Sequence, residues 1–316
     1  MLRSDVDWVD SARTALQLAE KHGDLIGVAA MYSSLAIAAN CRGDLRGSAK
    51  DFRHALKLYE EIDDLNGQSQ SLVGLGDAIH KTGSLPDAAS LFQRSLKLHP
   101  EPIRYHVIPV LDLAAVHRDM GDLPTAHRFA ATSVDLAHRF DVGARVSTAL
   151  TTLGSIECLI GQCPEALAHH QTALEISRQL ADIRGEIDAM CGLAVALSHL
   201  GQHQDATEEA NRVWLKLQDG APRGYEERAL TSITEVLLSA GDIQGAARLA
   251  TEAFDIHRSE GHLLAETRTL LLLGKAQLKN GDQAAAQAHF RRGLEIAQRI
   301  QAAETKELAL LIADEQ

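Results

Sequence analysis

Residues 75–100 read LGDAIHKTGSLPDAASLFQRSLKLHP, and this stretch decides the fold. An apolar run with helical spacing ends at Gly83, and a glycine there can adopt the left-handed conformation that caps a helix. Pro86 follows three residues later, at the start of the next helix, where a missing amide hydrogen costs nothing. The stretch therefore predicts two antiparallel helices joined by a tight turn.

The same pattern recurs along the chain with a constant period. Glycines at intervals of 38 or 40 residues each end an apolar helical stretch, and a small residue stands five positions after every one. One helix pair cannot bury its apolar face alone, but stacked pairs can. The period predicts a single solenoid over residues 1–316, with helices of about 17 residues. Its seven turns are expected at Gly43, Gly83, Gly121, Gly161, Gly201, Gly241 and Gly281.

The two ends of the chain depart from the full unit. Trp8 to His22 matches the second helix of a unit, so residues 1–22 are interpreted as a half-repeat helix. We expect this start to belong to a longer protein; a free-standing protein with one N-terminal capping helix is the alternative. An extra helix is expected within residues 302–316, where it would cap the last unit.

Two internal breaks are also predicted. Pro100, Pro102 and Pro109 crowd the junction before the third unit, so the first helix of that unit should be short. A milder break is predicted at residues 219–224, which read DGAPRG. The break at the proline-rich junction should also change the local path of the solenoid.

Composition excludes several classes of function. The formal charge of −12 opposes binding to phosphate, so direct nucleic-acid binding is not expected. No apolar stretch approaches the roughly 20 residues that span a bilayer, and the acidic first ten residues do not form a signal peptide. The four cysteines include no CxxC pair, which favours a reducing compartment. We expect a cytoplasmic protein without membrane segments.

A search for chemistry identifies no catalytic, cofactor or metal residues, so the chain is not predicted to be an enzyme. No HExxH motif occurs, and Gly201 interrupts the helix between His199 and His203. Cys158 and Cys163 are separated by one turn and are interpreted as two small buried hydrophobic residues. Gly274-Lys275 lacks the earlier glycine of a P-loop.

The unit resembles the tetratricopeptide repeat (TPR), with Leu75-Gly76, Gly83, Ala88, Phe92 and Pro100 at the matching positions. The period of about 40 exceeds the usual 34. The resemblance implies an all-α fold: a right-handed superhelix of antiparallel helix pairs, whose first helices line a concave groove for a protein or peptide ligand. The candidate partner surface comprises Asn40, Asp77, His80, Lys81, Arg118, Ser155, Asp188, His199, Arg228, Glu235, Arg268, Lys275 and Lys279.

The inner positions of the last two units are basic in a chain that is acidic overall. We hypothesise that Arg268 and Lys275 receive an acidic partner or an acidic part of the same protein; ordinary solvated charges are the alternative. The oligomeric state is left open.

The long period and residues 161–176, GQCPEALAHHQTALEI, are similar to the C-terminal TPR arrays of bacterial SARP-type regulators, in which a DNA-binding domain and an NB-ARC ATPase precede the repeats. This resemblance implies a non-catalytic sensor domain, whose partner could be other domains of the same polypeptide. A free-standing adaptor and a peptide-pheromone receptor are the alternative functions.

Overall fold

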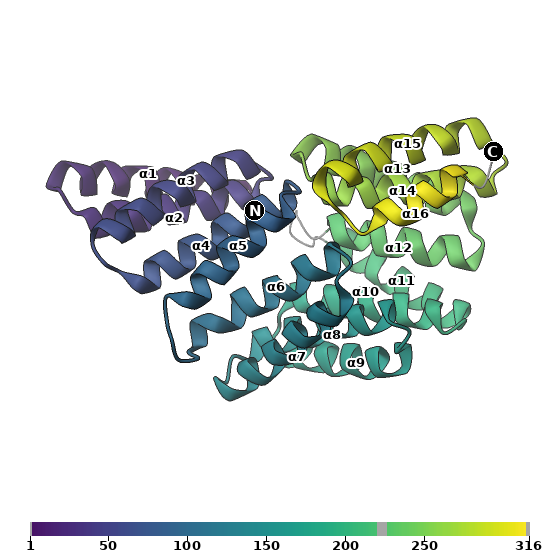
Figure 1. The fold of residues 1–316 in the computed structure, drawn as a ribbon, viewed down its shortest axis with the longest axis horizontal. Helices are drawn as coiled ribbons and strands as arrows, with labels where there is room; N and C mark the ends of the chain where they lie inside the picture. The colour runs from purple at the N-terminus through teal and green to yellow at the C-terminus, as the bar shows by residue number, and fades with distance from the viewer. Residues whose placement is uncertain (1, 220–225, 314–316) are drawn as a thin grey trace.

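The structure is a computed structural model that describes residues 2–219 and 226–313. Within these ranges the fold is all-α, a solenoid of antiparallel helix pairs (Figure 1). It begins with α1 (Leu2–His22) and ends with α16 (Glu304–Ala313). Seven helix pairs lie between them, and the solenoid bends so that its two ends approach each other.

The first helices of the pairs form the inner layer, because each contacts the first helix of the next pair. Most have 17 residues, which is the length expected from the period. In order they are α2 (Leu25–Cys41), α4 (Leu65–Lys81), α6 (Val107–Asp119), α8 (Gly143–Leu159), α10 (Ile183–His199), α12 (Glu226–Ala240) and α14 (Leu263–Lys279).

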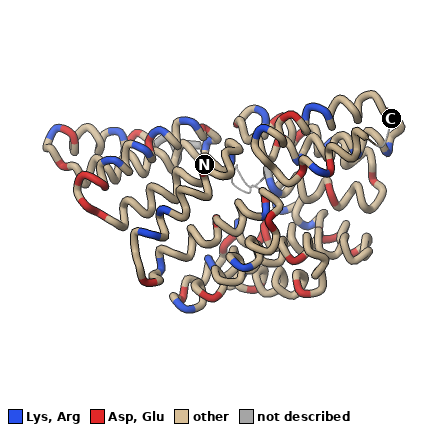
Figure 2. Tube along the Cα trace, in the orientation of Figure 1, with Lys and Arg blue, Asp and Glu red and all other residues tan. Residues whose placement is uncertain are grey.

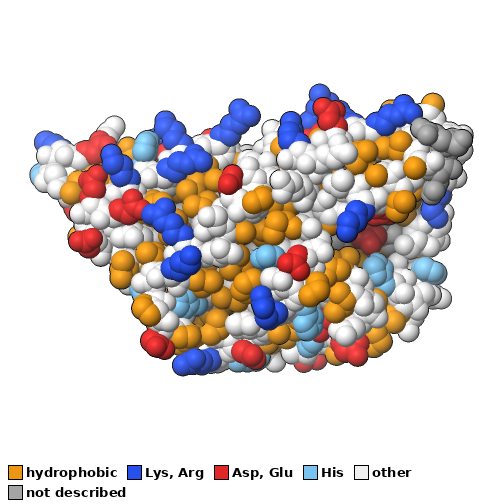
Figure 3. Space-filling view, in the orientation of Figure 1, with side chains coloured by type: hydrophobic (Ala, Val, Ile, Leu, Met, Phe, Trp, Pro, Cys, Tyr) orange, Lys and Arg blue, Asp and Glu red, His pale blue; other side chains and the backbone are white. Residues whose placement is uncertain are grey.

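The second helices form the outer layer. On the face in Figure 3, basic side chains gather along the upper edge, over α3 and α15. The second helices are α3 (Leu45–Glu61), α5 (Leu85–Lys97), α7 (Leu123–Arg139), α9 (Cys163–Gln179), α11 (His203–Gln218), α13 (Ile243–Glu260) and α15 (Gln283–Ile300).

The seven turn glycines have the conformation that the sequence predicts. Each adopts a positive φ, from 75° at Gly201 to 90° at Gly83. The helix after the turn is capped in four pairs by an aspartate that follows the glycine directly, as at Asp44, whose Oδ1 accepts the Gly47 amide at 2.9 Å. Glycine ends one helix and aspartate begins the next, which makes the turn tight.

Aromatic side chains of the outer layer pack against glycines of the inner layer. Phe92 and Phe290 are fully buried, and each stands nine residues after its turn glycine. A Cβ atom at Gly76 or Gly274 would overlap the ring of Phe92 or Phe290. These glycines therefore allow the two helices of a unit to approach closely.

His170 occupies the equivalent position in the fourth unit. Its ring is 1% exposed and lies between Gly154 of its own unit and Gly192 of the next, where a Cβ would collide with the imidazole. Burial lowers the pKa of His170 to about 4, so the ring is neutral at physiological pH.

The proline-rich junction shortens the helices around it. Helix α6 has 13 residues, as predicted, and a 3₁₀ turn, η1 (Arg104–His106), precedes it. Helix α5 also has only 13 residues, a shortening that we did not predict. Residues 220–224 of the break predicted at 219–224 lie outside the described residues, and so do residues 314–316 of the predicted C-terminal segment.

The bend brings the first three units against the last two, along a contact that we call the seam. The turns at Gly43, Gly83 and Gly121 face Glu260, Ile300 and Ala303 respectively. The Ala303 amide donates to the Asp119 carbonyl at 2.9 Å, and α14 contacts α4. A solenoid unit ordinarily touches only its neighbours, so the seam is a long-range closure of the superhelix.

Charged residues of both signs are interspersed along the trace (Figure 2). Among the described helices, none combines the length and the hydropathy that a membrane crossing requires.

Candidate functional site

The predicted partner surface lies on the inner layer, and most of its residues join one first helix to another. At the N-terminal end, Asn40 of α2 donates to Asp77 of α4 at 2.6 Å. Lys81, one turn after Asp77, lies 3.1 Å from the Asp77 carboxylate and donates to Asn40 at 3.1 Å. These three side chains link the first and second units.

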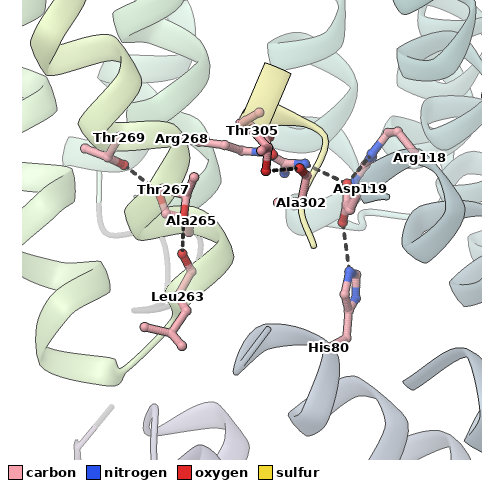
Figure 4. Close-up of polar contacts among 11 residues, drawn as sticks. His80, Arg118, Asp119, Leu263, Ala265, Thr267, Arg268, Thr269, Ala302 and Thr305 are labelled. Carbon is pink, nitrogen blue, oxygen red and sulfur yellow. Dashed lines mark hydrogen bonds and ion pairs between the residues drawn. The ribbon is translucent and has the colours of Figure 1, made fainter. Parts of the chain in front are cut away.

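Asp119, in the last turn of α6, is the centre of a polar cluster that spans the seam (Figure 4). It is 1% exposed. Its carboxylate lies 2.8 Å from His80 Nε2 and accepts from Arg118 Nε at 2.8 Å. It also accepts from Arg268 Nη2 of α14 at 2.6 Å, and Arg268 Nε in turn donates to Glu304 of α16 at 2.7 Å. We call this set of five residues the Asp119 cluster; it joins the second, third and seventh units across the seam.

The charge of the Asp119 cluster is balanced within the chain. Burial by itself would raise the pKa of Asp119, but Arg118, Arg268 and His80 outweigh it and hold that pKa well below its ordinary value. Asp119 is therefore an ionised, buried carboxylate whose neutralisation depends partly on a residue 149 positions away.

The pKa of Asp112, also on α6, is shifted in the direction opposite to that of Asp119. Asp112 is partly buried, and burial together with the nearby charge of Asp77 raises its pKa to about 8. The sequence search did not identify Asp112, because the charge that opposes its ionisation lies in another unit.

The middle of the inner layer contains weaker links. Ser155 donates to the Thr151 carbonyl of its own helix at 2.8 Å, which is a contact within one unit. Arg228 of α12 lies 3.7 Å from Asp188 of α10. These contacts are local, so they do not themselves close the superhelix.

Helices α10 and α12 are also joined by His199 and Glu235. His199 Nε2 lies 3.2 Å from Glu235 Oε1, and the hydrogen bond raises the pKa of His199. Glu235 then faces a recess of about 180 Å³ between α12 and α14. Figure 3 shows the hollow over α12 and α16. The recess is lined by Glu235, Leu238, Ser239, Leu272, Lys275 and Lys279.

The basic residues of the last units face acidic residues of the same chain. Lys275 Nζ lies 2.6 Å from Glu307 Oε1 of α16, and Arg268 Nη2 lies 2.6 Å from Asp119 Oδ1. We hypothesised either an acidic partner or an acidic part of the same protein for Arg268 and Lys275. In the structure, both side chains pair with carboxylates of this chain. Sequence reasoning missed Asp119, Glu304 and Glu307; the one local signal was an acid two residues before the turn glycine Gly121.

Solved structures with a similar fold include Rap proteins and a tetratricopeptide repeat protein. A Rap protein complexed with Competence and Sporulation Factor superposes with a TM-score of 0.71 at 16% identity, covering 85% of this chain and 75% of that one. The Rap conjugation gene regulator of plasmid pLS20, in complex with the Phr* peptide, gives 0.71 at 12% identity, with coverages of 90% and 77%. A tetratricopeptide repeat protein from Parabacteroides merdae gives 0.54 at 14% identity, with coverages of 90% and 97%.

These identities are low, so the likeness concerns the fold. A comparison with curated protein sequences found no match. A family model, by contrast, matches residues 7–301, which is nearly the whole chain, and that family is described as the MalT-like TPR region. The chain therefore belongs to the MalT-like TPR family.

Proposed function

We propose that the chain is a binding scaffold that holds a peptide, or an extended segment of a protein, along its inner layer. The observation that carries the proposal is the recess between α12 and α14. Leu238 and Leu272 are buried apolar residues in its wall, and the ammonium groups of Lys279 and of Lys275, which also pairs with Glu307, lie beside them. An apolar side chain next to a carboxylate, as at the C-terminus of a peptide, complements that arrangement.

The similar structures support the same kind of ligand. One of the two Rap proteins described above was solved in complex with the Phr* peptide and the other in complex with Competence and Sporulation Factor, and both share this fold at a TM-score of 0.71. The choice of ligand for this chain nevertheless depends on its own recess, since residues that bind peptides need not coincide at 12–16% identity.

A peptide-binding experiment tests the proposal. Fluorescent decapeptide pools, each with a fixed C-terminal residue and either a free or an amidated terminus, are titrated with the protein and followed by anisotropy. Pools with an apolar last residue and a free carboxylate should bind best. Lys279→Glu should weaken their binding at least tenfold, because an attractive charge becomes repulsive. Lys57→Glu, at a 76% exposed position on α3, is the matched control and should leave binding unchanged. Equal binding of all pools, or of the Lys279 variant and the control, contradicts the proposal.

We propose further that this scaffold is a non-catalytic regulatory domain in a cytoplasmic bacterial regulator. Membership of the MalT-like TPR family and the likeness of residues 161–176 to SARP-type arrays support this context. The test is the gene itself. A reading frame that continues upstream of Met1 into an ATPase module supports a regulatory domain, whereas a stop codon directly upstream supports the free-standing adaptor.

A further inference from the structure

Three side chains with metal-binding atoms converge at the inner ends of the fourth and fifth units. Cys158 lies in the last turn of α8, Cys163 is the first residue of α9, and His199 is the last residue of α10. The two sulfurs and a ring nitrogen of His199 all lie within 4.8 Å of one another. We infer that Cys158, Cys163 and His199 bind a zinc ion.

The ligand types and their spacing suit zinc. Thiolate sulfur and imidazole nitrogen are its usual ligands, at about 2.3 Å and 2.0–2.1 Å in a tetrahedral arrangement. These bond lengths put the ligand atoms roughly 3.5–3.8 Å apart. The three atoms here are at most 4.8 Å apart, so contraction by about 1 Å completes the site. Side-chain rotation can supply such a movement without moving the helices.

The backbone turn explains why the two cysteines meet. Gly161, with φ of 84°, reverses the chain between α8 and α9, so residues three positions before it and two after it lie on the same side. Cys163 Sγ lies 3.9 Å from the Cys158 carbonyl. Both thiols are 7% exposed, which shields them from oxidants while His199 is open to solvent at one edge.

Glu235 adds the interaction that a metal-binding histidine typically makes. Its carboxylate faces His199 Nε2 at 3.2 Å, which leaves Nδ1 of the same ring for a metal. A carboxylate on the far nitrogen fixes the orientation of the ring and strengthens the metal bond. The fourth position of the tetrahedron is then available to water.

Zinc binds cysteines as thiolates, so its binding releases protons, and its affinity for the site should fall as the pH is lowered.

Metal binding by the purified, tag-free protein tests the inference. The protein is loaded with Zn²⁺, dialysed, and its metal content measured; a parallel sample is titrated with Co²⁺. We expect one Zn²⁺ per chain, and a cobalt spectrum with thiolate-to-metal charge transfer. Cys158→Ala and Cys163→Ala should abolish both signals, and Glu235→Gln should weaken binding about 10- to 100-fold through its effect on His199.

Matched controls separate the site from general cysteine or histidine binding. Cys41→Ser removes an exposed cysteine of α2, and His203→Ala removes an exposed histidine only four residues after His199; both should retain full binding. Should a cysteine variant fail to fold, the cobalt spectrum of the unaltered protein decides the question. Absence of charge-transfer absorption there, or zinc content equal in the folded cysteine variants and the unaltered protein, overturns the inference.

Discussion

The Asp119 cluster predicts that one arginine controls closure of the superhelix. Arg268→Gln removes the hydrogen bonds to Asp119 at 2.6 Å and to Glu304 at 2.7 Å. Asp119 keeps Arg118 and His80, so the third unit retains its buried charge pair. The variant should therefore fold and should open specifically at the seam.

The size of the effect follows from the burial of the pair. A hydrogen bond to a charged group contributes about 1.5–3 kcal/mol. The side chain of Asp119 is 1% exposed and that of Arg268 is 33% exposed, so we place the contribution of the bond between them near the middle of that range. The bond from Arg268 to Glu304 lies within the C-terminal end of the solenoid and does not cross the seam, so it is not counted. A loss of about 2 kcal/mol shifts the ratio of closed to open molecules about 30-fold.

Small-angle scattering and urea unfolding together measure this shift. The radius of gyration of Arg268→Gln should increase, and the early part of the unfolding transition should move to lower urea. Arg228→Gln is the control, because Arg228 is 55% exposed and lies 3.7 Å from an aspartate of the adjacent first helix. Its loss should cost less than about 1 kcal/mol. Identical scattering and unfolding for the two variants would refute the role of Arg268.

Three further predictions follow from buried groups. Burial lowers the pKa of His170 from 6.5 to about 4, so on acidification the unfolded chain takes up a proton before the folded chain does. Stability is therefore complete above about pH 6.5 and falls by about 3 kcal/mol as the pH drops towards 4. His170→Phe should remove that loss, which urea unfolding at about pH 7 and pH 4.5 measures. The pKa of Asp112, raised to about 8, has the opposite sign: stability present below the ordinary pKa is lost as the pH rises through 8. Asp112→Asn should therefore raise the unfolding midpoint most above pH 8, less near pH 5, and little below about pH 4. Gly274→Val places a Cβ against the buried ring of Phe290 and should lower stability by about 1–3 kcal/mol or more in thermal unfolding.

The units themselves could be predicted because their causes are local. A turn glycine and the small residue five positions after it both act within one helix pair, so a fixed spacing reveals them. The short α6 was predictable for the same reason, since proline alters the helix in which it occurs. Because this local pattern recurs seven times, the arrangement of helix pairs can be predicted from the sequence.

The candidate sites could be predicted only in part, because each combines residues from separate units. Arg268 was identified as an inward charge, but its partner Asp119 is 149 residues away, and no local pattern specifies the pitch that brings them together. The zinc ligands were missed for a related reason. A search by helical spacing compared His199 with His203, whereas the structure places His199 beside two cysteines of the preceding unit.

Closure at the seam and binding on the inner layer must influence each other. The last helices carry both the Arg268 link to Asp119 and the recess that contains Lys275 and Lys279. If the ligand binds only the closed superhelix, its apparent affinity is reduced by the fraction of molecules that are open. In that case Arg268→Gln should weaken peptide binding by up to the same 30-fold, although Arg268 does not line the recess. The coupling is reciprocal, so a saturating peptide should also restore the compact scattering of the variant.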